Sequence, residues 1–183
     1  MSHKYKFRNP DGIYFITFTV VGWVDVFTRD VYRNVIIDNF DWYSKNKGLV
    51  IHAWVLMTNH VHMIISRRGS NKFEDIMRDF KKFTSVNTIK EIKNNTVESR
   101  KDWMLKIFKE AGKANKQNTN YKFWQNGNHP IELFNNKIME QKLDYIHNNP
   151  VKQGFTNSME CYNWSSAMDY AGMKGIVDVE LLW

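Results

Sequence analysis

Residues 54–65 limit the fold more than any other part of the chain. Their sequence is WVLMTNHVHMII, in which a polar pair at 58–59 separates two apolar runs and only His60 and His62 interrupt the second run. This pattern predicts a tight hairpin whose second strand carries both histidines. Strand side chains alternate between two faces, so His60 and His62 point the same way. Two imidazoles on one rigid strand can hold one metal ion.

Histidines packed in a core are the alternative to a metal site. A buried imidazole without a hydrogen-bond partner costs free energy, and two on one face of an otherwise apolar strand are difficult to explain by packing. We therefore favour a metal site at His60 and His62.

Composition narrows the class of protein. Of the 183 residues, 43% are hydrophobic and 15% aromatic, which excludes a disordered chain and suits one domain over residues 1–183. Lysine and arginine outnumber aspartate and glutamate by 26 to 19, giving a formal charge of +7. We therefore expect a polyanionic partner, nucleic acid first and an anionic membrane surface second. Cys161 is the only cysteine and no stretch has the length of a membrane span, so we expect a cytoplasmic protein without a disulfide or a membrane anchor.

Hydrophobic periodicity divides the chain into elements in the order strand, helix, strand, strand, helix, strand, helix. Residues 90–120 interrupt this order as an insertion with a helical piece at 103–111, and 155–183 form a C-terminal tail. Residues 131–134 extend the fourth strand or bridge to the last helix. The expected elements are a strand at 12–21, a helix from Asp30 to about 46–48, hairpin strands at 49–57 and 60–66, a helix from 70 or 71, a strand at 121–125, and a helix from 135 or 136 that Pro150 stops.

This order predicts an α/β (α+β) ferredoxin-like sandwich, an antiparallel sheet with helices on one face. Strands one and three then lie side by side at the centre of the sheet. The histidine strand is one of these two, so its side chains are held rigidly.

The last predicted helix supplies a second group of polar residues. Tyr145 and Asn149 are four residues apart and share a helix face, with Gln141 one turn earlier. A phenol and an amide oxygen could thus meet the histidines of the hairpin. A partly buried tyrosine beside a helix end is the structural alternative.

These residues resemble a known family, the HUH single-tyrosine transposases, and in particular their REP-associated tyrosine transposase branch. The resemblance covers nearly the whole chain and is weakest between 90 and 120. It rests on YFITFT at 14–19, AWVLMTNHVH at 53–62, FWQ at 123–125, YIHNNPVK at 145–152 and WSSA at 164–167.

The resemblance implies a site and a reaction. His60 and His62 correspond to the metal ligands, Asn149 to the polar ligand and Tyr145 to the nucleophile; the insertion-sequence branch carries glutamine where Asn149 stands. The implied activity is that of a DNA transposase, a single-strand endonuclease that cleaves and rejoins DNA through a 5′-phosphotyrosine with Mg²⁺ or Mn²⁺. The implied partner is single-stranded or hairpin DNA.

Basic and aromatic side chains are the candidates for contacts with that DNA. Trp23 and Trp103 join Trp124 as candidates for base stacking, with core packing as their alternative. The candidate DNA-binding residues are Arg67, Arg68, Arg78, Lys81, Lys82, Trp124 and Lys152.

Two other functions compete with a transposase. A metal-dependent phosphodiesterase without a covalent intermediate would need the histidines but not Tyr145, and a noncatalytic hairpin nucleic-acid binding protein would need neither. The apolar residues between 177 and 183 also favour a homodimer, unless this tail folds back on its own domain.

Overall fold

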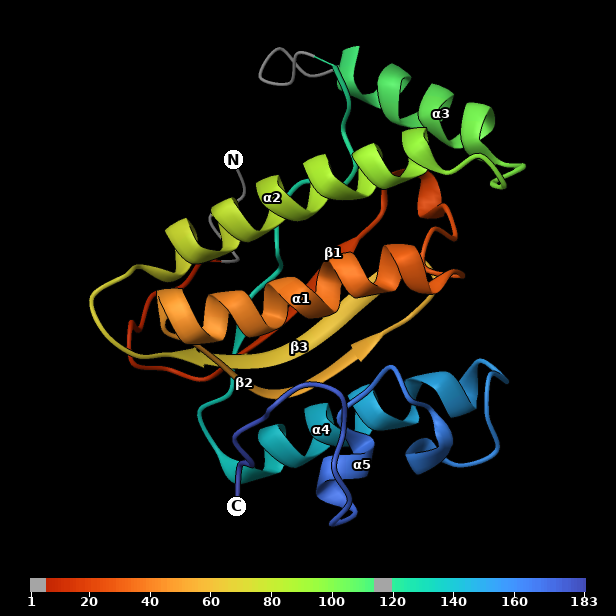
Figure 1. Ribbon diagram of the computed structural model, residues 1–183. Coiled ribbons are helices and arrows are strands. Elements are labelled where there is room, and N and C mark those ends of the chain that lie inside the picture. Colours follow the sequence, from red (N-terminus) through yellow and green to blue (C-terminus); the bar gives the residue numbers. More distant parts are fainter. Residues whose placement is uncertain (1–5, 114–119) are drawn as a thin grey trace.

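The computed structural model describes residues 6–113 and 120–183 and contains a four-stranded antiparallel sheet. Its strand order is β2-β3-β1-β4, the order of a ferredoxin-like sheet (Figure 1). β1 and β3 lie side by side at the centre, as the sequence predicted. The strands are β1 (Tyr14–Thr19), β2 (Leu49–Leu56), β3 (His60–Arg67) and β4 (Ile131–Glu132).

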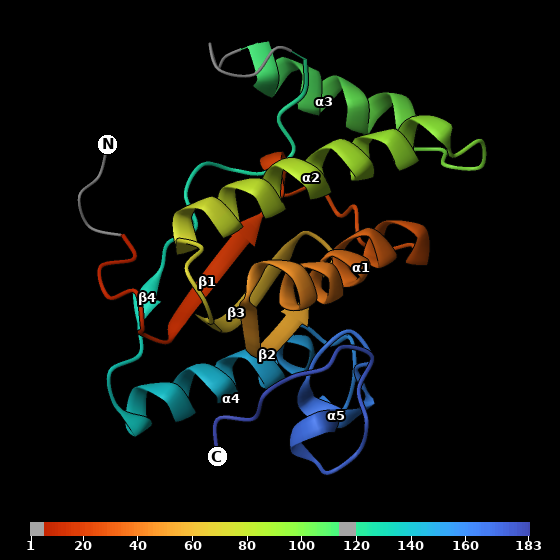
Figure 2. The same ribbon diagram turned by 60° about the vertical axis from the view of Figure 1, so that its left-hand side comes forward.

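Helices cover both faces of this sheet, whereas the sequence pattern predicted one covered face. Helices α1 (Asp30–Lys47) and α2 (Phe73–Asn94) lie on one face, and α4 (Asn136–Lys152) and the short α5 (Ala167–Tyr170) lie on the other (Figure 2). The reason is that all eight residues of β2 and the first six of β3 are buried, so both faces need a cover. Helix α3 (Lys101–Lys113) packs beyond α2, away from the sheet.

The predicted hairpin forms between β2 and β3. Trp54 pairs with Met63, Val55 with His62 and Leu56 with Val61, around a turn at Thr58 and Asn59. On its other side β3 pairs with β1, which sets Thr17 opposite His62 and Thr19 opposite His60. The histidines are thus held between two strands.

The period of two along β3 separates two cores. Val61, Met63 and Ile65 belong to the larger core under α1 and α2, while Ile64 belongs to a smaller core under α4. His60 and His62 share the face of Ile64. The smaller core contains Phe15, Ala53, Val55, Met57, Ile64, Leu143 and Ile146, among others.

The largest differences from the predicted boundaries lie at the fourth strand and at the end of the last helix. The fourth strand was predicted at 121–125, but that segment makes only one isolated bridge, from Trp124 to Val20, and β4 is the two-residue strand further along. The apolar character of 121–125 reflects burial of Phe123 and Trp124 in the larger core. Pro150 does not stop α4, which continues to Lys152, because a proline near a helix end removes only one hydrogen bond.

The C-terminal tail folds back on its own domain. Val177 is buried in the larger core and Leu182 packs against the smaller one. The Glu180 amide donates to Ile51 O at 2.9 Å, which covers the outer edge of β2. The apolar tail therefore gives no argument for a homodimer, which stays a prediction without this support.

No helix between 6 and 113 or between 120 and 183 is long and apolar enough to cross a membrane.

Candidate active site

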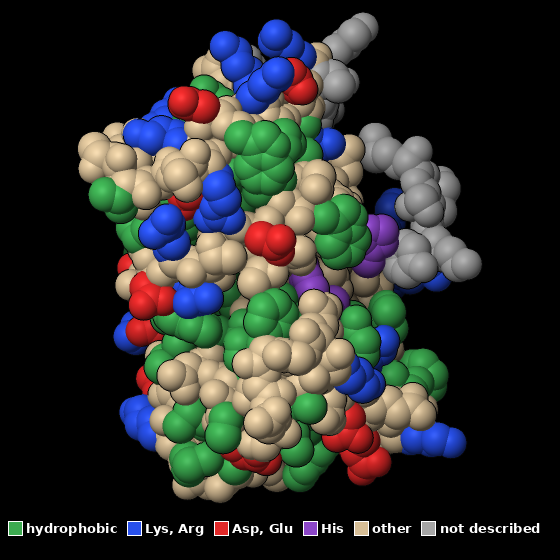
Figure 3. All heavy atoms as spheres, turned by 90° about the vertical axis from the view of Figure 1, so that its right-hand side faces the viewer, with side chains coloured by type: hydrophobic (Ala, Val, Ile, Leu, Met, Phe, Trp, Pro, Cys, Tyr) green, Lys and Arg blue, Asp and Glu red, His purple; other side chains and the backbone are tan. Residues whose placement is uncertain are grey.

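His60 and His62 lie next to each other on the α4 face of the sheet. Their ring centroids are 4.7 Å apart, and both side chains are largely buried. Histidine side chains surface near the middle of the face drawn in Figure 3. The shared orientation predicted from the H-x-H spacing is present.

Each imidazole is oriented by a hydrogen bond at Nδ1. His62 Nδ1 lies 2.8 Å from Thr17 Oγ1, on the neighbouring strand. His60 Nδ1 lies 2.7 Å from Asn59 Oδ1, in the hairpin turn. Both rings thus keep Nε2 for another partner, the arrangement found where histidines bind metal ions.

Tyr145 meets the histidines from α4 of the same chain. Its hydroxyl lies 3.4 Å from His62 Nε2, and the two ring centroids are 5.1 Å apart. The side chain is 40% exposed, so the phenol faces both the imidazole and solvent. Lys142, one turn earlier, places Nζ 5.5 Å from the Tyr145 ring centroid and 4.6 Å from that of Phe15.

Asn149 lies one helical turn beyond Tyr145. Only 6% of the residue is exposed, and within the described part of the chain its Oδ1 accepts no hydrogen bond. Since Lys142 lies over Phe15 of β1 and Tyr145 over His62, α4 runs toward the His60 end of β3, and Asn149 follows in that direction. A buried carbonyl oxygen without a donor suits a cation.

These groups could hold a divalent ion as two imidazole nitrogens and one amide oxygen. Residues 6–113 and 120–183 contain no cluster of three or more His, Cys, Asp or Glu side chains that could do so. Burial lowers the pKa of His60 to about 4, against the opposing effect of Asp25. Burial, with His60 and Lys142, lowers the pKa of His62 to about 3. Both rings are neutral at pH 7 and able to donate lone pairs to a metal.

All three predicted DNA-binding arginines are engaged within the protein. Arg67 donates to the carbonyls of Pro10, Gly69 and Asn71, and Arg68 pairs with Glu180. Arg78 pairs with Asp75 and Asp79 on its own helix. Lys82 and Lys152 are exposed.

Lys81 and Trp124 have structural roles. The Lys81 ammonium donates to the carbonyls of Gln125 and Gly127, both at 2.9 Å, and burial with nearby Lys122 lowers its pKa to about 8. Trp124 is only 5% exposed and donates its indole N–H to Thr84. Its ring packs in the larger core, which is the alternative weighed for it, and this burial gives no support to base stacking. Trp23 and Trp103 are exposed, and Trp23 lies edge-on to His60.

A basic groove runs along α2 on the opposite side of the sheet from Tyr145. Its volume is about 890 Å³, and its described lining includes five lysines and no carboxylate. One wall is Gln125, whose amide donates to Thr19 O, and Thr19 pairs with His60. The groove therefore ends one strand away from the histidines. The lysines are Lys81, Lys82, Lys90, Lys93 and Lys122.

Sequence reasoning missed several residues of the site. Thr17 and Lys142 lie in predicted elements, and the alternation of β1 and the spacing of α4 could have pointed to them. Asp25, which accepts hydrogen bonds from the hairpin turn, lies in a loop without a local pattern and could not have been found this way.

Comparison with solved structures finds this fold in a protein of known structure. One similar structure, a REP-associated tyrosine transposase bound to a REP hairpin, has a TM-score of 0.62 and 21% sequence identity, with 100% of this chain and 94% of that chain covered. None of the curated proteins compared matches the chain.

The chain belongs to the family of IS200-like transposases, because the family model matches residues 13–106. The match includes the hairpin with His60 and His62 and ends before α4. It therefore supports a transposase function and does not extend to Tyr145.

Proposed function

We propose that this protein is a transposase that nicks and rejoins single-stranded DNA through a covalent link to Tyr145. The observation that carries the proposal is that the Tyr145 hydroxyl lies 3.4 Å from His62 Nε2, on a residue that is 40% exposed. A tyrosine on a helix above two fixed histidines offers a nucleophile at the place where a phosphodiester could be held.

The chemistry needs no nucleotide cofactor. Tyr145 Oη attacks the scissile phosphorus, a P–O bond to tyrosine forms, and the bond to the 3′-oxygen breaks. The phenol gives up its proton and the departing 3′-oxygen gains one, so a free 3′-hydroxyl and a 5′-phosphotyrosine result. Attack by another 3′-hydroxyl reverses the step and joins new ends. The phosphodiester energy is kept throughout.

His60, His62 and Asn149 would hold the divalent metal, Mg²⁺ or Mn²⁺. When bound, such an ion polarises a nonbridging phosphate oxygen and offsets negative charge. Two neutral imidazoles whose Nδ1 atoms are already hydrogen-bonded, and a buried amide oxygen without a donor, fit this ligand set. Lys142 adds a fixed positive charge beside Tyr145, which favours a phosphate in front of the phenol.

The DNA partner is inferred to be single-stranded or hairpin DNA. The structural neighbour was solved with a REP hairpin, and the chain carries +7 formal charge. Trp23 is 61% exposed beside His60 and offers a ring for base stacking. The basic groove along α2 offers a track for the phosphate backbone.

The proposed reaction is complete within one chain, since Tyr145 meets the histidines of its own subunit. A homodimer would serve only to hold two DNA ends together. We also infer one domain over residues 1–183 and a cytoplasmic location, the latter from the single cysteine, Cys161.

Covalent trapping tests this function. The protein is incubated with a labelled DNA hairpin that carries a single-stranded flank and Mn²⁺, and the products are run on a denaturing gel. We expect a protein–DNA adduct that Tyr145→Phe abolishes, with DNA affinity retained. His60→Ala and His62→Ala should lose both the adduct and Mn²⁺-dependent cleavage.

The same gel separates the competing functions. Cleavage that persists in Tyr145→Phe without an adduct would identify a metal-dependent phosphodiesterase. DNA binding without cleavage in the unmodified protein, at any Mn²⁺ or Mg²⁺ concentration, would identify a noncatalytic hairpin nucleic-acid binding protein.

A further inference from the structure

An aspartate from a distant loop holds the turn that precedes His60. Asp25 Oδ1 accepts hydrogen bonds from Thr58 Oγ1 at 2.6 Å and from Asn59 Nδ2 at 2.9 Å. Asn59 Oδ1 lies 2.7 Å from His60 Nδ1. One side-chain amide thus links a carboxylate to the imidazole.

The donors and acceptors along this link can be in only one order. An ionised carboxylate only accepts hydrogen bonds, so the amide nitrogen of Asn59 must face Asp25. The amide oxygen then faces His60, and because this oxygen only accepts, His60 Nδ1 must carry the proton. A neutral imidazole protonated at Nδ1 has its lone pair on Nε2. Asp25 therefore specifies the tautomer of His60 through Asn59, with the longer bond from Asn59 Nδ2 to Trp23 O, at 3.4 Å, acting in the same sense.

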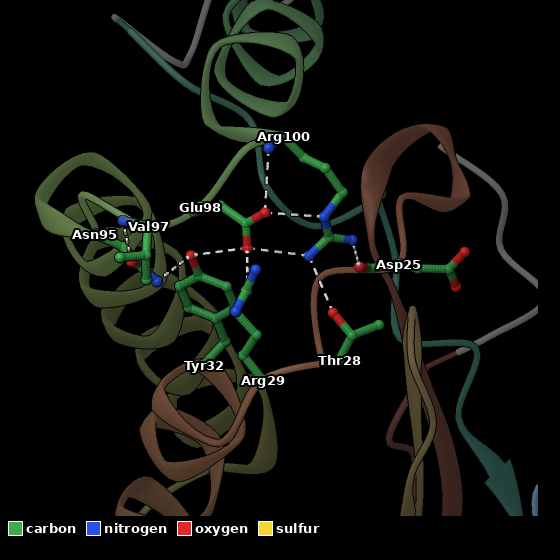
Figure 4. A network of polar contacts seen from close by, with 8 residues as sticks. All are labelled: Asp25, Thr28, Arg29, Tyr32, Asn95, Val97, Glu98 and Arg100. Atoms are coloured by element: carbon green, nitrogen blue, oxygen red, sulfur yellow. Dashed lines mark hydrogen bonds and ion pairs between the residues drawn. The ribbon is translucent and has the colours of Figure 1, made fainter.

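The loop that carries Asp25 is itself anchored (Figure 4). Arg100 donates from Nη1 to Asp25 O at 2.6 Å and from Nη2 to Thr28 Oγ1 at 3.0 Å. Arg100 also pairs with Glu98, whose side chain is fully buried. Hydrogen bonds from Arg100 are the main reason that the pKa of Glu98 is lowered to about 2.

This anchor joins Asp25 to the core of the domain. Glu98 also accepts hydrogen bonds from Arg29 and from Tyr32, a fully buried side chain of α1. The position of Asp25 is thus set by charged groups around the connection between α2 and α3.

We propose that Asp25 is a positioning residue, which acts through Asn59 to hold His60 in the Nδ1–H tautomer with Nε2 aimed at the metal and the scissile phosphate. The metal part of this inference rests on the proposed function, while the tautomer does not. Partners of this kind raise metal affinity by fixing the ligand before the ion arrives.

A purely structural role for Asp25 is the alternative, because the same carboxylate also fastens the turn through Thr58. Three variants separate the two roles. Asp25→Ala removes both bonds, Thr58→Val removes only the fastening bond, and Asp25→Asn keeps an acceptor oxygen for the Asn59 amide. Asp25 is exposed, so we expect all three to fold, with circular dichroism and thermal unfolding as the check.

The first measurement is nitrogen NMR of the imidazoles in the metal-free protein at pH 7.5. The unmodified protein, Thr58→Val and Asp25→Asn should keep His60 protonated at Nδ1. Asp25→Ala should give a mixture of tautomers. An unchanged Nδ1–H tautomer in folded Asp25→Ala, or Nε2–H in the unmodified protein, would overturn the proposal.

The second measurement is Mn²⁺ affinity by calorimetry. Asp25→Ala should bind Mn²⁺ roughly 10-fold more weakly, with Asp25→Asn and Thr58→Val within about 2–3-fold of the unmodified protein, and saturating Mn²⁺ should restore cleavage. Equal loss in Thr58→Val and Asp25→Ala would instead mean a structural role and reject the proposal. If the unmodified protein binds no Mn²⁺ while the tautomer still changes in Asp25→Ala, the positioning of His60 stands and the proposed metal chemistry fails.

Discussion

The two faces of the sheet are packed with different kinds of side chain. Under α1 and α2, aromatic rings stack into a continuous apolar core, with Phe80 against Phe18, Phe40 and Tyr43. Under α4 the core is smaller and the buried set includes His60, His62, His147 and Asn149. Both faces are built from the same strands, since successive residues of β3 point to opposite sides.

The α1 and α2 face therefore supplies most of the folding stability, whereas the α4 face carries the polar groups of the candidate site. Burial of large apolar side chains is the main favourable term in folding, and most of it lies on the α1 and α2 face. Buried polar groups on the α4 face cost free energy unless they are bonded or bind a ligand. The fold can bear that cost because most of the buried apolar side chains lie on the other face.

The largest expected effect is therefore on stability, from the apolar face. Phe80→Ala removes a fully buried ring and should lower the free energy of unfolding by about 3–5 kcal/mol, measured by urea denaturation. Tyr145→Phe on the other face should stay within about 0.5 kcal/mol of the unmodified protein while losing the covalent adduct. A similar loss of stability in both variants would remove the contrast between the faces.

Much of this arrangement is readable from the sequence, because it is local. The alternation at 54–65 predicts the hairpin and the common face of His60 and His62, and the spacing of Tyr145 and Asn149 predicts their common helix face. The packing of α4 on the histidine face does not follow from either pattern. It depends on β2 and β3 being buried on both sides.

The features that sequence reasoning missed depend on contacts between distant segments. β4 is too short for a pattern, and its predicted place at 121–125 is apolar because Phe123 and Trp124 enter the larger core. Asp25 acts on Asn59 across 34 positions of sequence. The tail looked like an exposed apolar patch because its partner, the edge of β2, is more than a hundred residues away.

The second largest expected effect is a loss of folding stability in acid, which comes from the α4 face. Burial lowers the pKa of His147 from 6.5 to about 4, against Asp144 and Glu160, so the unfolded chain takes up a proton at a higher pH than the folded one. The stability is present above pH 6.5 and is lost as pH falls toward 4. Between pH 7.5 and 4.5, His147→Gln should lose about 2–3 kcal/mol less stability than the unmodified protein.

Urea denaturation at the two pH values gives this difference directly, so any cost of the substitution at pH 7.5 cancels. Equal losses in both proteins would mean that His147 takes up its proton in the folded state near its ordinary pKa. Any loss of stability of the α4 face in acid would then come from other titratable groups.

The next expected effect is on DNA affinity and comes from replacing an exposed tryptophan. Trp23 lies beside His60, with an unusual positive φ of 55°, whereas Trp103 is on α3, away from the sheet. A base stacked on a ring contributes about 1–3 kcal/mol, so Trp23→Ala should bind a single-stranded flank about 10-fold more weakly. Trp103→Ala is the matched control and should change affinity little. Fluorescence anisotropy with labelled DNA measures both, and a larger loss in Trp103→Ala would move the DNA away from the histidine site.

The smallest expected effect tests whether the basic groove along α2 binds DNA for the reaction on the α4 face. Lys90 and Lys93 line the basic groove, and a lysine that neutralises one phosphate adds about one unit to the dependence of log affinity on log salt. The double variant Lys90→Gln, Lys93→Gln should weaken hairpin binding a few-fold and reduce that salt dependence by about two. The rate of adduct formation on DNA already bound should not change, because neither lysine is near Tyr145.

A control double variant, Lys45→Gln with Lys174→Gln, removes the same charge from lysines paired with Asp41 and Asp178. If it reduces the salt dependence equally, the attraction comes from net charge alone and the groove is not the track of the backbone.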